Sequence, residues 1–197
     1  MRATFFDLHD IASQPWKNGA GRTREIASAP SADGAEGFDW RFSVAEVEHE
    51  APFSQFPGVD RCIVLLRGAG LRLHGGDGAV DHRLDRVGTP FHFSGDLALT
   101  GTPIAGASSD FNVMTRRGLW RAEVEVHHAA FALHPAAVTL LLGCEGEWST
   151  SAAAAPILQA QQGLLLQDTD ELLHCVPLSI PAGGSLLVAR LCHDRAP

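Results

Sequence analysis

The sequence predicts an all-β protein made of two copies of one β unit, and two observations lead to that prediction. Most segments are short and apolar, often alternate in polarity, and end at Gly, Pro, Asp or Ser, which is the pattern of strands and turns. The chain also repeats itself at a shift of 75 residues, because Gly68 falls on Gly143 and Gly88 falls on Gly163. Its 197 residues suffice for two small antiparallel β-barrels or sandwiches.

The individual strands follow from this alternation. Residues 39–47 alternate, so that Trp40, Phe42 and Val44 face one way while Arg41 and Ser43 face the other. Residues 61–67 form an apolar run that glycines end, and further strands are expected around 71–73, 90–93 and 111–114. Residues 151–162 are the best helix candidate, although a proline interrupts them.

The two halves differ in chemistry. Polar residues at strand and loop positions concentrate before Arg117, whereas the second half is mainly Leu, Ala, Val and Gln. We therefore expect residues 1–117 to form a barrel that carries a pocket, and residues 118–197 to form a structural barrel. The two are expected to pack intimately as one unit.

Composition excludes several classes of partner. The chain has 15 basic and 23 acidic residues and a net charge of −8, which argues against nucleic acid and against an anionic membrane surface. Its four cysteines are far apart and form no Cys-x-x-Cys pair, as expected for free thiols in a reducing compartment. The first residues lack the apolar run of a signal peptide, and no run reaches the length of a membrane helix. A cytoplasmic protein is the expectation.

The sequence predicts no metal, no cofactor and no catalytic nucleophile. Ten histidines are present, but none forms the His-x-His pattern that places two imidazoles on one face of a strand. The chain has no Gly-x-Ser-x-Gly motif, and its cysteines lie in no electropositive motif.

The densest polar segment is residues 16–26, WKNGAGRTREI. Its two glycines allow tight turns and a close approach of the backbone to a ligand. Lys17, Arg22 and Arg24 could donate to a carboxylate or phosphate, with Trp16 as an apolar wall. The segment is not a phosphate-binding Walker loop, because the Gly-Lys-Ser/Thr ending is missing. A solvated turn is the alternative.

Two strands could supply further walls of a pocket. Asn112 and Met114 share one face of the strand around 110–117, which would suit a small polar ligand with an apolar stem. Arg41 faces away from Trp40 and Phe42, and a buried arginine needs an anionic partner. Glu25, Asp110 or a ligand carboxylate could fill that role, and the sequence leaves the choice open.

Four ordered motifs resemble the HutD/Ves family: residues 16–26, 38–45 (FDWRFSVA), 53–61 (FSQFPGVDR) and 110–116 (DFNVMTR). The resemblance implies a metal-free bicupin, that is, two RmlC-like jelly-roll barrels in one chain. It also implies a role in limiting histidine utilisation by binding an intermediate such as urocanate or formylglutamate. Carried over to this chain, the implied ligand-binding residues are Trp16, Lys17, Asn18, Thr23, Arg24, Arg41, Ser43, Asn112 and Met114.

The sequence therefore favours a protein that binds a small carboxylate metabolite over an enzyme. A cupin isomerase or hydrolase that uses Glu25, Asp110 or His92 as acid or base is the first alternative. A protein-interaction module that docks through the leucine-rich second half is the second. Open barrel edges would also allow a homodimer.

Overall fold

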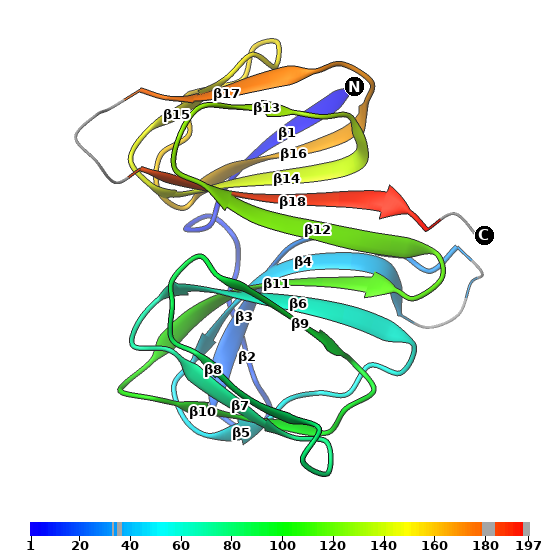
Figure 1. Cartoon of the computed structure of the whole chain (residues 1–197), viewed down its shortest axis with the longest axis vertical. Helices are drawn as coiled ribbons and strands as arrows, with labels where there is room; N and C mark the ends of the chain where they lie inside the picture. Colours follow the sequence, from blue (N-terminus) through cyan, green and yellow to red (C-terminus); the bar gives the residue numbers. More distant parts are fainter. Residues whose placement is uncertain (33, 35–36, 179–183, 195–197) are drawn as a thin grey trace. The chain divides into compact units, whose positions relative to one another are not determined.

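A computed structural model describes residues 1–32, 34, 37–178 and 184–194 (Figure 1). Every regular element among these residues is a β-strand, so the predicted all-β class is confirmed. The described residues include no helix of the length and apolarity that crossing a membrane requires. The strands divide between two compact units.

The first unit, called the pocket unit, is built on Ala12–Arg121 and contains a six-stranded and a four-stranded sheet. The larger sheet has the order β2-β3-β4-β11-β6-β9 and the smaller has the order β5-β10-β7-β8. The strands are β2 (Gln14–Pro15), β3 (Gly21–Pro30), β4 (Phe38–Val47), β5 (Ala51–Pro52), β6 (Val59–Arg67), β7 (Leu71–Gly75), β8 (Val80–Leu84), β9 (Pro90–Ser94), β10 (Leu99–Pro103) and β11 (Ser108–Arg116).

The other unit, called the second unit, comprises Met1–Ile11 and Ala122–His193. Its sheets have the orders β1-β16-β14-β18-β12 and β13-β17-β15. The strands are β1 (Arg2–Asp7), β12 (Trp120–His127), β13 (Phe131–Leu133), β14 (Ala136–Glu145), β15 (Trp148–Thr150), β16 (Gln162–Thr169), β17 (Leu173–Pro177) and β18 (Ser185–His193).

The two units repeat one strand order. The run β4-β11-β6-β9 of the pocket unit corresponds to β12-β18-β14-β16 of the second unit. The pairings β11–β6 and β14–β18 also share a register shift near one end. Just past that shift lie Asp110, paired with Leu65, and Leu186, paired with Gly143. Asp110 and Leu186 therefore occupy equivalent positions, as do Asn112 and Val188 two residues later.

Two expectations about the elements need correction. Residues 151–162 form turns and an isolated bridge rather than a helix, because Leu158 exchanges two backbone hydrogen bonds with Trp148 and Pro156 cannot donate one. The first eleven residues fall in the second unit instead of the first, because β1 pairs with β16 over six residues. The sequence could not show this pairing, which joins residues about 160 positions apart.

The interiors of the two units differ. In the second unit an apolar cluster between the sheets includes Leu186 and Val188, together with Trp148. In the pocket unit the apolar cluster of Ile63, Leu65 and leucines from the small sheet fills only part of the space. The remaining inner positions of the large sheet carry polar side chains, and a pocket lies there.

Candidate functional site

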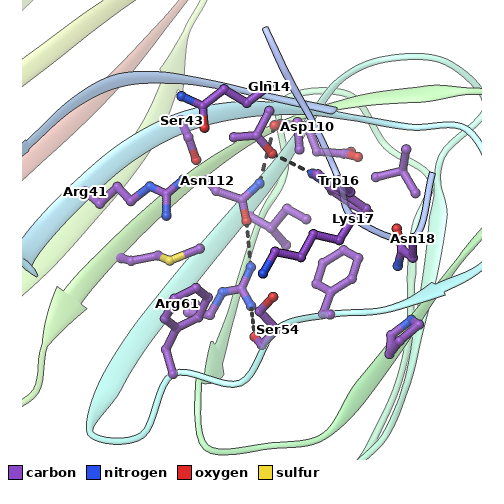
Figure 2. Close-up of a pocket in the computed structure, with 18 of the residues that line it drawn as sticks. Gln14, Trp16, Lys17, Asn18, Arg41, Ser43, Ser54, Arg61, Asp110 and Asn112 are labelled. Carbon is purple, nitrogen blue, oxygen red and sulfur yellow. Dashed lines mark hydrogen bonds between the residues drawn. The ribbon is translucent and has the colours of Figure 1, made fainter. Parts of the chain in front are cut away.

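The pocket has a volume of about 750 Å³ and lies inside the pocket unit (Figure 2). Its floor is the inner face of β4, β11 and β6, and its sides come from the segment before β3 and from the loop between β5 and β6. The lining residues are Gln14, Pro15, Trp16, Lys17, Asn18, Thr23, Arg41, Ser43, Ala45, Val47, Pro52, Phe53, Ser54, Phe56, Arg61, Ile63, Asp110, Asn112 and Met114.

Strand register arranges the floor in rows. Met114 of β11 pairs with Arg41 of β4 on one side and with Arg61 of β6 on the other. Because neighbouring strands lie about 4.8 Å apart, the two arginine backbones are roughly 10 Å apart across this row. Like charges in such positions repel. The row is therefore suited to an anion that both guanidinium groups can approach.

Arg61 is the most deeply buried cation of the pocket, with only 7% of its surface exposed. Its Nη2 donates to Asn112 Oδ1 at 3.1 Å and its Nη1 donates to the Ser54 carbonyl at 3.3 Å, whereas its Nε has no partner. Within the described part of the chain no carboxylate forms an ion pair with it. Burial, reinforced by the charge of Arg41, lowers the pKa of Arg61 to about 10, so the group stays charged at neutral pH.

Aromatic rings stabilise this buried charge. The Arg61 guanidinium carbon lies 4.8 Å from the ring centre of Phe93, 5.4 Å from that of Phe53 and 5.6 Å from that of Phe56. Cation–π contacts of this kind compensate part of the cost of taking a guanidinium out of water. They offer no directional acceptor, so Nε stays buried without a hydrogen-bond partner.

Two further cations line the pocket. Arg41 Nε lies 2.9 Å from Glu25 Oε2, as an ion pair without hydrogen-bond geometry, and the carboxylate of this pair is largely exposed. Lys17 is exposed and extends from the segment before β3, and its side chain points into the pocket in Figure 2. The three cations come from separate segments of the chain, which the fold brings to one cavity.

Among the described residues that line the pocket, Asp110 is the only acidic one, and its side chain has no exposed surface. Its Oδ2 accepts a hydrogen bond from Ser108 Oγ at 2.8 Å, whereas its Oδ1 has no partner. Burial raises the pKa of Asp110 to about 7. Asn112 lies between the two charged groups: its Nδ2 donates to the Asp110 carbonyl at 3.4 Å, and its Oδ1 accepts from Arg61.

The segment before β3 is held in a tight turn. Trp16 N donates to the Gly21 carbonyl, and Gly19, with φ of 71°, donates back to the Trp16 carbonyl. A Cβ on Gly21 would collide with the Glu46 carbonyl and touch the Trp16 ring, so glycine is required there. Trp16 Nε1 donates to Thr23 Oγ1 at 2.8 Å, and the indole packs edge-on against Phe53. The indole is thereby fixed as an apolar wall.

Eight of the nine ligand-binding residues expected from the sequence line this one pocket. Arg24 does not, because alternation along β3 turns it away from Thr23, and it forms an ion pair with Glu46 at 3.0 Å. Asn18 and Thr23 already form hydrogen bonds within the loop, which gives both a structural role.

Arg61 was missed among the sequence-based candidates, as were Phe53 and Phe56. One signal was available for Arg61: it is in phase with Ile63 and Leu65 along its strand, so a charge stands at an inward position. The aromatic residues lie in a loop, where no periodicity indicates direction.

The loop that carries Phe53, Ser54 and Phe56 is anchored by the turn at Gly95 and Asp96. Phe56 N donates to the Gly95 carbonyl, Gly58 N donates to Asp96 Oδ1 at 2.7 Å, and Gln55 Nε2 donates to the Asp96 carbonyl. Arg117 donates to Asp96 Oδ2 at 2.9 Å. Ser94 Oγ also donates to Asp96 Oδ2, at 2.7 Å. The hydrogen bonds that the carboxylate accepts from Ser94, Gly58 and Arg117, in this order of effect, lower the pKa of Asp96 to about 2.

We expect Asp96→Ala to free this loop without unfolding the protein. The loop loses the Gly58 hydrogen bond, and a hydrogen bond to a charged group contributes enough for amide exchange in residues 53–58 to rise about 10-fold. Hydrogen exchange followed by mass spectrometry measures this. Asp81→Ala, which removes an exposed carboxylate bound to Arg72, is the control and should leave these amides unchanged. Equal exchange in both variants would show that Asp96 does not anchor the loop.

The sequence profile of the HutD family matches residues 8–184. The chain belongs to the HutD family. Protein Ves of Citrobacter koseri is 36% identical over 183 residues, covering 92% of this chain and 91% of that protein. An uncharacterised 21.2 kDa protein in the hutC 3′ region of Pseudomonas putida is 35% identical over 170 residues, covering 83% and 86%.

A solved structure of HutD from Pseudomonas fluorescens SBW25 is also similar. It has a TM-score of 0.84 to this chain at 25% identity, and the match covers 98% of this chain and 99% of that one. In this HutD family chain, the described residues contain no group of three or more His, Cys, Asp or Glu side chains placed to hold a metal ion.

Proposed function

We propose that the pocket binds a small carboxylate metabolite, an intermediate of histidine degradation such as urocanate or formylglutamate, and that the protein thereby regulates histidine utilisation. The observation that carries the proposal is the buried Arg61, a fixed cation with a free Nε and no carboxylate partner in the described chain. Arg41 and Lys17 add two cations to the same cavity, and Trp16 and Met114 provide apolar walls for a stem.

The energetics favour an anionic ligand. An unpaired buried charge destabilises the folded protein, and a like-charged neighbour adds to that cost. A carboxylate that reaches Arg61 and Arg41 relieves both, and charge-assisted hydrogen bonds contribute about 1.5–3 kcal/mol each. A site that is preformed for an anion therefore explains why the ligand-free protein retains a buried charge that destabilises it.

The relatives support the choice of metabolite. The family name and the Pseudomonas putida relative both refer to hut genes. The Pseudomonas fluorescens HutD structure was obtained in a formate condition, and formate is the simplest carboxylate. In line with the family, we propose that the two units are the two cupin barrels of a bicupin, for which the repeated strand order is the support.

Thermal shift and calorimetry with urocanate and N-formyl-L-glutamate test the proposal. Saturating ligand should raise the Tm of the wild type, because the ligand binds only the folded state. Arg41→Ala should lose most of that rise while its ligand-free Tm stays close to wild type, because the Glu25 partner is exposed. Arg72→Ala, which removes an exposed arginine of the same unit, should keep the full rise. A wild-type rise in Arg41→Ala would exclude its role, and no rise with either acid in the wild type would refute the proposal.

A second function, catalysis on such a carboxylate, is favoured by Asp110. A buried carboxyl group whose pKa is raised to about 7 is suited to general acid–base chemistry near neutral pH. Incubation of the purified protein with urocanate or N-formyl-L-glutamate, followed by NMR, distinguishes the two functions. New products that Asp110→Asn fails to form would establish an isomerase or hydrolase, whereas unchanged acids would leave binding as the function.

A further inference from the structure

The pocket has a second polar pole besides its arginines. The Asp110 Oδ1 atom is fully buried and has no hydrogen-bond donor, although its carboxyl group belongs to the pocket lining. A buried acceptor without a partner costs free energy, and native proteins rarely leave one unpaired without a functional reason. Ser108 holds the other oxygen, so the orientation of the carboxyl group is fixed.

The second unit shows that the fold itself does not need this carboxyl group. Leu186 occupies the position equivalent to Asp110, and Val188 occupies the position equivalent to Asn112. Both are buried in an apolar cluster. The same strand in the same topology is thus filled by hydrocarbon in one unit and by a carboxyl and an amide group in the other. The polar pair therefore serves the pocket rather than the packing.

The distance between the two poles follows from strand geometry. Arg61 Nη2 reaches Asn112, which lies two residues from Asp110 along β11. At about 3.4 Å per residue, the guanidinium and the Asp110 row are roughly 7 Å apart. Figure 2 shows Asn112 between the two charged groups. A small planar or extended molecule can span this distance.

We propose that the pocket selects ligands with two ends: a carboxylate that binds Arg61 and Arg41, and an N–H donor that binds Asp110 Oδ1. The inference rests on the proposed function for the carboxylate end and adds the chemistry of the other end. An imidazole N–H or an amide N–H meets the requirement. A carboxylate with only hydrocarbon or an ether oxygen at the far end leaves Asp110 Oδ1 without a donor.

Matched pairs of acids test the inference by calorimetry at pH 8. Urocanate is compared with trans-3-(2-furyl)acrylate, in which oxygen replaces the ring N–H and carbon replaces the second ring nitrogen. N-formyl-L-glutamate is compared with glutarate, which lacks the formamido group. The wild type should bind at least one donor-bearing acid about 10-fold or more tightly than its partner, because a buried polar group left unpaired rejects the analogue.

Variants at Asp110 give the decisive comparison. Asp110→Leu, which copies the residue of the second unit, should bind both members of a pair with equal affinity and should bind the donor-free acid at least as tightly as the wild type. Asp110→Asn keeps an acceptor oxygen but not the charge, so it should retain part of the preference for the donor-bearing acid. It takes the place of Asp110→Leu in the comparison with the wild type if the leucine variant does not fold. A preference that survives in Asp110→Leu would overturn the inference.

The outcomes separate this inference from the proposed function. Binding that depends on Arg61 but does not distinguish the members of either pair would overturn the two-ended pocket and leave carboxylate binding in place. If none of the four acids binds the wild type, both proposals fail. A preference that disappears in Asp110→Leu supports both.

Discussion

Replacing Arg61 with methionine is expected to reduce carboxylate affinity about 10- to 100-fold, because charge-assisted hydrogen bonds to a buried guanidinium are lost. The unfolding free energy should not fall by more than about 1 kcal/mol. Methionine keeps an unbranched apolar stem that can pack against Phe53, Phe56 and Phe93 in place of the guanidinium, and it removes the cost of burying a charge without a counterion. Calorimetry gives the affinity, and urea unfolding gives the stability.

A large loss of carboxylate affinity without a comparable loss of unfolding free energy would identify Arg61 as a binding residue. Asn112→Leu is a useful companion variant, because it removes the side chain that positions Arg61 but leaves the cation in place. It should weaken binding less than Arg61→Met does. A large loss of stability in Arg61→Met together with wild-type affinity would show that the arginine only supports the fold.

Asp110→Asn is expected to become increasingly more stable than the wild type as pH rises from about 4 to about 7. Burial holds the pKa of Asp110 near 7 in the folded state, against an ordinary value of 3.8. The folded state therefore binds this proton more strongly than the unfolded state does. Stability from the protonated group is complete below pH 3.8 and is lost as pH rises toward 7, by an amount on the order of 4 kcal/mol.

The difference in unfolding free energy between variant and wild type isolates this effect, because other groups titrate in both proteins. Urea unfolding at a series of pH values between 4 and 8 measures it. Asp96→Asn is the control, since hydrogen bonds lower the pKa of Asp96 to about 2. Stability from Asp96 is lost only as pH falls through that value, so its difference curve should be flat in this range. A flat difference curve for Asp110→Asn as well would mean that the Asp110 carboxyl group of the folded wild type is ionised over the whole range from pH 4 to 8.

Much of the fold could be predicted because β-strands leave a local record. Residues 39–47 alternate, and the structure has the predicted strand at Phe38–Val47. Arg41 and Ser43 lie on its pocket side, whereas the alternation left open whether that side faces solvent or a cavity. The apolar run at 61–67 is likewise a strand, Val59–Arg67. In both cases the period of two arises within a few residues, from the alternation of side chains along an extended backbone.

The helix expected at 151–162 failed because alanines and a turn are compatible with several local structures, and pairing of Leu158 with Trp148 decides among them. The register of the repeat also escaped prediction. The equivalent pairs Asp110–Leu186 and Asn112–Val188 stand 76 residues apart, whereas the glycines suggested 75. Leu65 and Gly143, which are also equivalent, stand 78 residues apart, so the offset changes along the chain because the segments between equivalent strands differ in length.

The sequence by itself determined the all-β class, the family, and the concentration of polar groups in residues 16–26 and at Arg41 and Asn112, because motifs and alternation are local properties. Only the tertiary structure decided which cations share a cavity. It paired Arg24 with Glu46 of the neighbouring strand, and it buried Arg61 among aromatic rings with an unpartnered Nε. It also left the Oδ1 atom of Asp110 without a donor. Whether a charged side chain is buried, and whether it finds a partner, depends on strands that are distant in the chain. These two properties decide which charged groups of the pocket lack a partner.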